Sequence, residues 1–263
     1  MARTNVKFTK MHGLGNDFIV INGITEPFSI QNSSIKKLAD RHQGIGFDQL
    51  LVLKPGKNAD FSCDIFNSDG SEAEQCGNGM RCLARFIAEE KLSDKPNLTI
   101  ATKGGTVETL IKNFNQITVN MGVPHFKKNL ELELENKTFP LTILSLGNPH
   151  AILQVNSVQD FPVSQLAPSI STHAVFPEGI NVGFMEIVNR DRIRLRTFER
   201  GAGETLACGS NACAAVVTGI QNQLLNAKIS VELKLGTLEI EWQGKDHPVF
   251  LTGPAEKVFE GEI

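Results

Sequence analysis

The stretch Phe66–Cys82, FNSDGSEAEQCGNGMRC, returns in altered form as Phe198–Cys213, FERGAGETLACGSNAC. In both copies a phenylalanine is followed ten residues later by a cysteine, Cys76 or Cys208, and then by a glycine. The offset between the two cysteines is 208 − 76 = 132. A repeat of this length decides how the whole chain is organised, so it is considered before any local signal.

The same offset relates motifs that lie well outside the two stretches. Gly15-Asn16 corresponds to Gly147-Asn148, and Gln49 corresponds to Asn181. Because the offset is close to half the length of the chain, the sequence reads as a gapless tandem duplication. We expect two similar domains, residues 1–122 and 123–263, facing each other across a pseudo-twofold axis. The linker is expected near residues 121–124, with the short C-terminal segment allowed to return to the first domain.

The local patterns predict many short strands and two helices. Apolar or β-branched runs bounded by Gly, Pro and Asn predict strands at 18–21, 49–53, 98–101, 116–120, 192–196 and 238–242. Apolar residues at i, i+3, i+4 and i+7 predict one helix after each repeated cysteine. They are Met80, Leu83, Ala84 and Ile87 in the first copy, and Cys213, Val216, Val217 and Ile220 in the second. These stripes are core packing, and they fix where each helix begins.

Composition excludes several classes of function. With 41% hydrophobic and 21% charged residues, the chain suits a globular protein with an apolar core. A net charge of -3 gives no reason to expect nucleic acid or a membrane as partner. Residues 1–10 do not form a secretory signal, and no apolar run approaches the roughly 18 residues of a membrane span. We expect a cytoplasmic protein.

The cysteine pattern argues against a metal or a disulfide scaffold. The five cysteines, Cys63, Cys76, Cys82, Cys208 and Cys213, are few and odd in number. They form no CxxC pair, and their spacing fits no common zinc site. No dinucleotide fingerprint, Walker lysine or pyridoxal-type lysine is evident, so no cofactor is expected. Reduced thiols, buried or reactive, remain.

A cysteine at the start of a helix stands in a favourable place for acid–base chemistry. The first backbone N–H groups of a helix have no partner inside it, and the macrodipole adds positive charge there. We expect the thiol pKa to fall from about 8.5 towards neutrality. The amides of Gly77-Asn78 and Gly209-Ser210 are expected to hold an anion such as a carboxylate.

A matched pair of such cysteines suggests one reaction type. A single one is more often a buried capping residue, whereas two on a pseudo-twofold axis would approach one carbon from opposite sides. That arrangement suits inversion at the α-carbon of an amino acid, where one thiolate removes a proton and the other thiol delivers one. The two helix N-termini would stabilise the carbanion that forms.

At these residues the sequence resembles diaminopimelate epimerase. The resemblance covers nearly the whole chain and rests on specific motifs: MHGLGNDF (Met11–Phe18), GFDQLL (Gly46–Leu51), GNPH (Gly147–His150), GINVGF (Gly179–Phe184) and the two cysteine stretches. Phe198 departs from the pattern, because many members of the family carry Tyr there.

The resemblance implies a fold, an activity and a set of site residues. The fold is α/β (α+β), with two pseudo-symmetric domains, each a mostly antiparallel sheet wrapped around a central helix. The activity is interconversion of LL- and meso-diaminopimelate for lysine and peptidoglycan synthesis, without a cofactor, in a homodimer. Cys76 and Cys208 match the acid/base pair, with His150 and Glu199 in support. The substrate-binding set comprises Asn16, Gln49, Asn67, Gly77, Asn78, Asn148, Asn181, Glu199, Arg200, Gly209 and Ser210.

The two halves of the repeat differ at positions that could distinguish the two ends of a substrate. Asn67 is replaced by Glu199, and a carboxylate in one half alone offers a partner for an ammonium group. Arg200 has the planar fork that suits a distal carboxylate. Taken alone, Arg200 is more often a surface charge. The polar residues Asn16, Gln49, Asn148 and Asn181 are, taken alone, more often turn or capping residues.

Two alternatives remain open from the sequence. A proline racemase or hydroxyproline epimerase has paired cysteines but lacks this Asn/Gln set and Arg200. A non-enzymatic thiol protein that binds metal or senses redox state is the alternative from another class.

Overall fold

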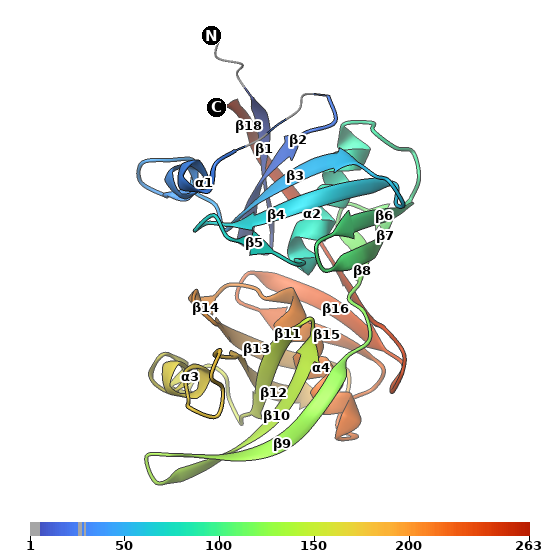
Figure 1. Cartoon of the computed structure of the whole chain (residues 1–263). Helices are drawn as coiled ribbons and strands as arrows, with labels where there is room; N and C mark the ends of the chain where they lie inside the picture. Colours follow the sequence, from blue (N-terminus) through green and yellow to red (C-terminus); the bar gives the residue numbers. More distant parts are fainter. Residues whose placement is uncertain (1–5, 26–27, 29) are drawn as a thin grey trace. The chain divides into compact units, whose positions relative to one another are not determined.

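The computed structural model describes residues 6–25, 28 and 30–263 (Figure 1). Residues 1–5, which belong to the segment expected not to be a secretory signal, lie outside the described part. The chain divides into two compact units. The first comprises the described residues up to Val119 together with Gly253–Ile263, and the second comprises Asn120–Thr252.

The first unit contains two helices and a set of short strands. The helices are α1 (Asn32–Ala39) and α2 (Gly77–Glu89). The strands are β1 (Lys7–Gly13), β2 (Asn16–Asn22), β3 (Gln49–Pro55), β4 (Phe61–Asn67), β5 (Glu72–Ala73), β6 (Asn97–Thr102), β7 (Gly105–Asn113), β8 (Gln116–Asn120) and β18 (Glu256–Glu262).

The second unit repeats this inventory. Its helices are α3 (Val163–Ser171) and α4 (Gly209–Gln221). Its strands are β9 (His125–Leu134), β10 (Lys137–Leu146), β11 (Asn148–Gln154), β12 (Asn181–Asn189), β13 (Arg192–Glu199), β14 (Gly203–Thr205), β15 (Lys228–Leu233), β16 (Gly236–Trp242) and β17 (Val249–Gly253).

Strand pairing is the same in the two units. The first sheet runs β18-β1-β2-β3-β4-β6-β7-β8, and the second runs β9-β10-β11-β12-β13-β15-β16-β17. In each sheet two pairs are parallel, β2–β3 and β4–β6 in the first and β11–β12 and β13–β15 in the second. The other pairs are antiparallel. The expected fold class, two duplicated α+β halves with mostly antiparallel sheets, is confirmed.

The register of the central strands repeats position by position. Phe18 pairs with Gln49 in the first unit, and His150 pairs with Asn181 in the second, so both partners keep the offset of the cysteines. The offset changes to 131 at β6 and β15 (228 − 97) and to 133 at β8 and β17 (249 − 116). The prediction of a gapless duplication is therefore wrong beyond the helices, where surface loops tolerate insertions and deletions.

The C-terminal strand completes the first unit. In Figure 1 the dark-red β18 lies beside the blue β1, and the two strands pair in antiparallel fashion. In the second unit the corresponding outer place beside β10 is taken by β9, which precedes it directly in the chain.

The central strands are apolar on both faces because a helix covers each face. In the first unit Ile19, Ile21, Leu50 and Val52 cluster with Ile35 of α1. Phe18 and Leu51, on the other face, lie against Gly79 of α2. Strands covered on both sides read as continuous apolar runs rather than alternating ones. The strand runs predicted from the sequence lie within β2, β3, β6, β8, β13 and β16.

The two helices predicted from periodicity are confirmed. Helix α2 follows Cys76 and packs against β1, β2, β3 and β7, so the sheet wraps around it (Figure 1). Helix α4 follows Cys208 and packs against β10, β11, β12, β13 and β16. No helix in the described part of the chain is long and apolar enough to cross a membrane.

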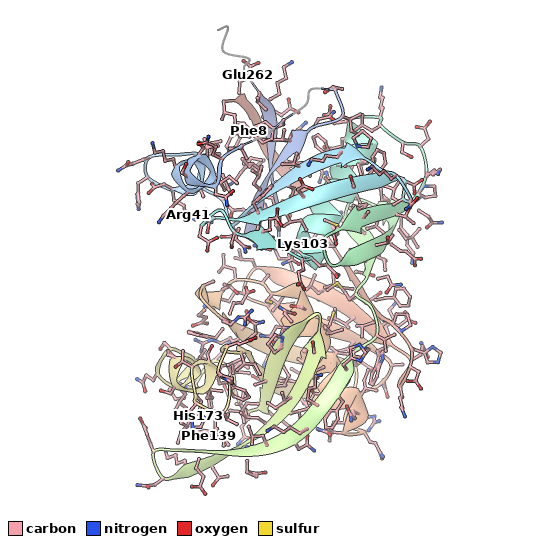
Figure 2. The ribbon with its side chains drawn as sticks, in the orientation of Figure 1. Phe8, Arg41, Lys103, Phe139, His173 and Glu262 are labelled. Atoms are coloured by element: carbon pink, nitrogen blue, oxygen red, sulfur yellow. The ribbon has the colours of Figure 1, made fainter. Side chains whose placement is uncertain are left out.

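Phe8 tests the packing of β1 in the first unit. Its side chain is buried, belongs to the cluster around α1, and meets Phe259 of β18 edge-on with ring centroids 6.0 Å apart (Figure 2). We expect Phe8→Ala to lower the free energy of unfolding by about 3 kcal/mol, because it leaves a cavity. Urea denaturation measures this. Phe126→Ala, at a side chain 44% exposed, is the control and should change it by less than about 0.5 kcal/mol. Equal effects would contradict this packing.

Candidate active site

The sheet topology gathers the predicted polar residues at one end of each sheet. Because β2 and β3 are parallel, their first residues, Asn16 and Gln49, lie at the same end. Strand β4 runs antiparallel to β3 and ends there at Asn67, which pairs with Gln49. The second unit repeats this with Asn148, Asn181 and Glu199. Each unit thus has one polar cluster at its sheet end.

Cys76 is the N-cap residue of α2. Its extended backbone (φ -148, ψ 108) stops the chain from continuing as helix, and its sulfur accepts a hydrogen bond from the N–H of Gly79 at 3.4 Å. The thiol donates to Oδ1 of Asn16 over 3.9 Å. Nδ2 of Asn78 donates to the same oxygen at 3.1 Å. The structure therefore brings together three of the predicted residues: Asn16, Cys76 and Asn78.

Gln49 and Asn67 form a second polar pair in this unit. Nε2 of Gln49 donates to Oδ1 of Asn67 at 2.9 Å, and Nδ2 of Asn67 donates to Oγ of Ser71 at 3.0 Å. Both side chains are half-buried. Their orientation is thus fixed by neighbours in β4 and in the turn after it.

A network of charged side chains holds Asn16 in place. Asp48 accepts from Nδ2 of Asn16 at 2.7 Å, and Arg41 donates to both Asp48 and Asp17 at 2.9 and 2.7 Å. Figure 2 shows Arg41 beside α1. Lys10 Nζ lies 2.7 Å from Asp17. Burial alone would raise the pKa of Asp17, but the hydrogen bonds from Arg41 and Lys10 outweigh it and lower that pKa to about 2.

Cys208 is likewise the N-cap residue of its helix, α4, but it is more deeply buried. Its backbone is extended (φ -122, ψ 109), and its sulfur lies 3.6 Å from Oγ of Ser210. Burial, together with the charge of Glu199, raises the pKa of the Cys208 thiol well above its usual range, against the effect of Ser210. The expectation that helix position lowers the thiol pKa is therefore wrong for Cys208, because burial outweighs the helix terminus.

His150 orients the amide of Asn148. The fully buried imidazole places Nε2 2.8 Å from Oδ1 of Asn148, so Nε2 carries the proton. Nδ2 of Asn148 then faces Oγ of Ser210 at 3.5 Å. Burial lowers the pKa of His150 to about 3, so the ring is neutral at physiological pH. His150 thus reaches the Cys208 cluster through Asn148 and Ser210.

Asn181, Glu199 and Arg200 complete the cluster of the second unit. Nδ2 of Asn181 donates to the carbonyl of Pro149 at 3.2 Å, and its Oδ1 accepts from the backbone N–H of Arg200 at 2.9 Å. The guanidinium of Arg200 donates to the carbonyl of Glu178 at 2.9 Å. Glu199 accepts from Thr205 Oγ1 at 2.6 Å.

Sequence reasoning missed the residues that hold the site residues in place. Asp48 lies inside the quoted GFDQLL motif, directly before Gln49, and Arg81 lies inside the stretch around Cys76. The available signal for Arg81 was a charged residue between Met80 and Cys82 in a stretch that is otherwise buried. No such signal marks Thr205.

Two properties of the cysteines bear on possible metal chemistry. All five are free thiols, with Cys76 half-buried and the others buried. Among the described residues no group of three or more His, Cys, Asp or Glu side chains is arranged to hold a metal ion.

Comparison with known proteins gives the class and the family. A family model described as diaminopimelate epimerase matches the chain twice, over residues 8–127 and 142–258. Proteins named diaminopimelate epimerase from Nitrosomonas eutropha and Stutzerimonas stutzeri are 48% and 47% identical to it. Both alignments cover 98% of this chain and 99% of the relative. The chain is therefore an isomerase, of the epimerase type. It belongs to the diaminopimelate epimerase family.

Solved structures show how widely this fold is shared. A hydroxyproline epimerase from Agrobacterium vitis superimposes with a TM-score of 0.79, 13% identity and coverage of 99% of this chain and 93% of that one. A PhzF-family phenazine biosynthesis protein from Bacillus anthracis gives a TM-score of 0.76 at 18% identity, covering 99% of both chains. These likenesses show the fold alone.

Asp17 gives the charged network a measurable pH dependence. Its pKa falls from 3.8 to about 2 on folding, so its stabilising effect is complete above about pH 4 and is lost as the pH falls towards 2. We expect Asp17→Asn to lower the free energy of unfolding at pH 7 by about 1 kcal/mol, allowing for partial solvent screening.

Urea denaturation at pH 7, 4 and 2.5 measures this effect. The difference in unfolding free energy between Asp17→Asn and the parent protein should be smaller at pH 2.5 than at pH 4. Asp94→Asn, at a carboxylate in the loop after α2, is the matched control. A difference in unfolding free energy that stays constant down to pH 2.5 would show that the ionisation of Asp17 is not linked to folding.

Proposed function

We propose that the chain interconverts LL- and meso-diaminopimelate by a two-base mechanism in which Cys76 and Cys208 are the acid and base. The observation that supports this most strongly is the equivalence of the two cysteines in the repeat. Each is the N-cap residue of the helix enclosed by its sheet, and each adjoins a polar cluster with an asparagine at the start of the corresponding strand.

The reaction needs one ionised and one protonated sulfur. The thiolate takes the α-proton of the substrate, the electron pair is held as a planar carbanion or enediolate, and the thiol gives its proton to the opposite face. Atoms balance, because one proton leaves the carbon and another replaces it. The reverse reaction starts with the protonation states exchanged, so a single pair serves both directions.

Differences between the two clusters favour one starting state. Cys76 is only half-buried, so a negative charge on its sulfur loses less hydration than a charge on a buried sulfur would. Cys208 is buried beside Glu199, and both factors raise its thiol pKa. In this proposal the free enzyme holds Cys76 as thiolate and Cys208 as thiol.

The α-proton is very weakly acidic, so the developing anion needs fixed donors. The first-turn amides at Gly77-Asn78 and Gly209-Ser210 lie at the positive ends of α2 and α4. In the proposal they bind the substrate carboxylate and stabilise the enediolate. Glu199 pairs with the substrate ammonium, and Arg200 with a distal carboxylate, alongside Asn16, Gln49, Asn67, Asn148 and Asn181.

The alternative substrates are proline and hydroxyproline. The hydroxyproline epimerase shares the fold at 13% identity, whereas relatives named diaminopimelate epimerase are 44–48% identical. We therefore propose diaminopimelate. The resemblance also supports a cytoplasmic homodimer that works without a cofactor and supplies lysine and peptidoglycan synthesis.

The acid/base pair is tested by single cysteine variants. We expect Cys76→Ala and Cys208→Ala each to reduce epimerisation of LL-diaminopimelate by at least about 10³-fold, since each removes one of two required proton carriers. Chiral chromatography of the products measures the rate. Cys213→Ala, at a buried cysteine one turn into α4, is the matched control and should retain activity.

Two outcomes would contradict the proposal. Full activity in either Cys76→Ala or Cys208→Ala would exclude the two-base mechanism. Turnover of proline or hydroxyproline by the parent protein, with none of diaminopimelate, would exclude the substrate. Circular dichroism of each variant establishes that a loss of activity is not a loss of fold.

A further inference from the structure

Arg81 is the largest fully buried side chain of the described residues, and its charge lies in the helix that begins at Cys76. Its Nε donates to the carbonyl of Pro254 at 3.1 Å, and its Nη1 donates to Oδ1 of Asn78 at 2.9 Å. A buried guanidinium is costly to place unless its donors are used, so these bonds hold it in one orientation. Arg81 therefore fixes the side chain of Asn78.

Arg81, Asn78, Asn16 and Asp48 form a series of hydrogen-bonded side chains. The residues at its two ends fix the direction of every hydrogen bond in it. Arg81 can only donate, so Oδ1 of Asn78 faces it and Nδ2 of Asn78 faces Asn16. At the far end the carboxylate of Asp48 can only accept, so it takes Nδ2 of Asn16. Oδ1 of Asn16 is thereby directed at the sulfur of Cys76.

This arrangement suits a sulfur that must lose and regain a proton. When Cys76 is protonated, its S–H donates to Oδ1 of Asn16. When Cys76 is ionised, that donor is lost, but Nδ2 of Asn78 still satisfies the same oxygen. The N–H of Gly79 still donates to the sulfur of the thiolate. Oδ1 of Asn16 therefore keeps one hydrogen-bond donor, Nδ2 of Asn78, when Cys76 is ionised.

The hairpin that carries Asn16 is built to admit the guanidinium. A Cβ atom added at Gly13, the last residue of β1, would lie only 2.7 Å from Nη2 of Arg81. The turn that follows contains Leu14 and Gly15, both with positive φ, and leads directly into Asn16. The absence of a side chain at position 13 therefore lets Arg81 pack against this hairpin.

The second unit has no arginine and asparagine at the positions equivalent to Arg81 and Asn78. At the equivalent positions of the repeat, Cys213 stands for Arg81 and Ser210 for Asn78. The charge that acts on Cys208 is instead the carboxylate of Glu199. The two thiols therefore have opposite electrostatic surroundings, with a fixed cation in the helix of Cys76 and an anion beside Cys208.

We propose that Arg81 is a positioning residue for Cys76: it holds the Asn78 amide against Asn16, and its fixed charge favours the thiolate of Cys76. This inference rests on the proposed function in that Cys76 is one of the two proton carriers. In this proposal, the charge of Arg81 is the difference between the two units that makes Cys76, rather than Cys208, the base in the free enzyme.

Other titratable groups around Cys76 are less suited to this role. Cys63 and Cys82 interact with Cys76, but burial raises the pKa of both thiols, that of Cys82 to about 12. The strands packed against α2 carry the charged residues Lys7, Lys10, His12, Asp17, Lys54, Glu108 and Lys112. Lys10 pairs with Asp17, His12 lies near Glu256, Lys54 pairs with Asp64, and Lys7, Glu108 and Lys112 are exposed.

The ionisation of Cys76 is the direct readout. In a Cys208→Ala background, the rate of Cys76 alkylation by iodoacetamide is followed from pH 5 to 10, with the labelled peptide identified by mass spectrometry. We expect Arg81→Met to raise the midpoint by at least about one pH unit, which lowers the alkylation rate at pH 7 about tenfold. An unchanged midpoint would overturn the proposal.

Arg85→Met is the matched control, because Arg85 lies one turn further along α2 and also anchors the C-terminal segment. It donates to the carbonyl of Ala255 at 2.5 Å and pairs with Glu89, and neither contact involves Asn78. A purely structural role for buried arginines in α2 predicts equal shifts for the two variants. We expect the Cys76 midpoint to move only in Arg81→Met, and an equal shift in Arg85→Met would overturn the proposal.

Two milder variants keep the test decisive if Arg81→Met does not fold. Arg81→Lys keeps the charge but loses the fork, so the Cys76 midpoint should stay within about 0.3 units while kcat falls about tenfold with little change in KM. Gly13→Ala displaces the guanidinium from the hairpin side and should also lower kcat with little change in KM. Parent-like kcat in both variants would overturn the proposal.

The two hypotheses fail in distinguishable ways. Alkylation of Cys76 does not depend on turnover, so a midpoint shift in Arg81→Met supports the positioning role whether or not diaminopimelate is the substrate. If the parent protein epimerises diaminopimelate and the midpoint does not move, the positioning role fails and the proposed function stands.

Discussion

Both polar clusters depend on one constraint, the parallel pairing of β2 with β3 and of β11 with β12. Parallel neighbours begin at the same end of a sheet, so Asn16 and Gln49 are brought together in one unit and Asn148 and Asn181 in the other. Such a pair needs a crossover connection, which here carries α1 or α3. The helices α2 and α4 then lie against these strands, and each begins at a cysteine.

The duplication supplies two similar scaffolds, and a few replacements make them different. Phe18 in the first unit corresponds to His150 in the second, Asn78 to Ser210 and Arg81 to Cys213. In the first cluster the asparagine directs its carbonyl oxygen at the cysteine. In the second, His150 takes the carbonyl of Asn148, so its amide group faces Ser210 beside Cys208. The equivalent asparagines therefore turn opposite ends of their amide groups towards the equivalent residues Asn78 and Ser210.

Much of the fold was predictable because the repeat is visible at one offset through both cysteine stretches. The two helices and their capping cysteines follow from the spacing of apolar residues after Cys76 and Cys208. The return of β18 to pair with β1 was only allowed for, not predicted, since its residues are mostly exposed and give no clear pattern. Short helices such as α1 were missed because eight residues give too little periodicity.

The residues of the candidate site could be predicted from the sequence, but the residues that hydrogen-bond to them and hold them in place could not. Asparagine and cysteine motifs are visible in the sequence, whereas the partners of Asn16 lie 32 and 62 residues away in the chain, at Asp48 and Asn78. The pKa of Cys208 could not be foreseen either, because it depends on tertiary burial and on Glu199 rather than on position in the helix. Contacts of this kind arise only once the sheet has formed.

The most direct test of the two-sulfur account is the fate of the α-proton in heavy water. LL-diaminopimelate is incubated with the parent protein in deuterium oxide, and substrate and product are separated at low conversion and analysed by mass spectrometry. If two different sulfurs remove and deliver the proton, the meso product carries α-deuterium while the remaining LL substrate stays protonated. Deuterium entering the remaining substrate as fast as the product would show a single exchanging base and contradict the account.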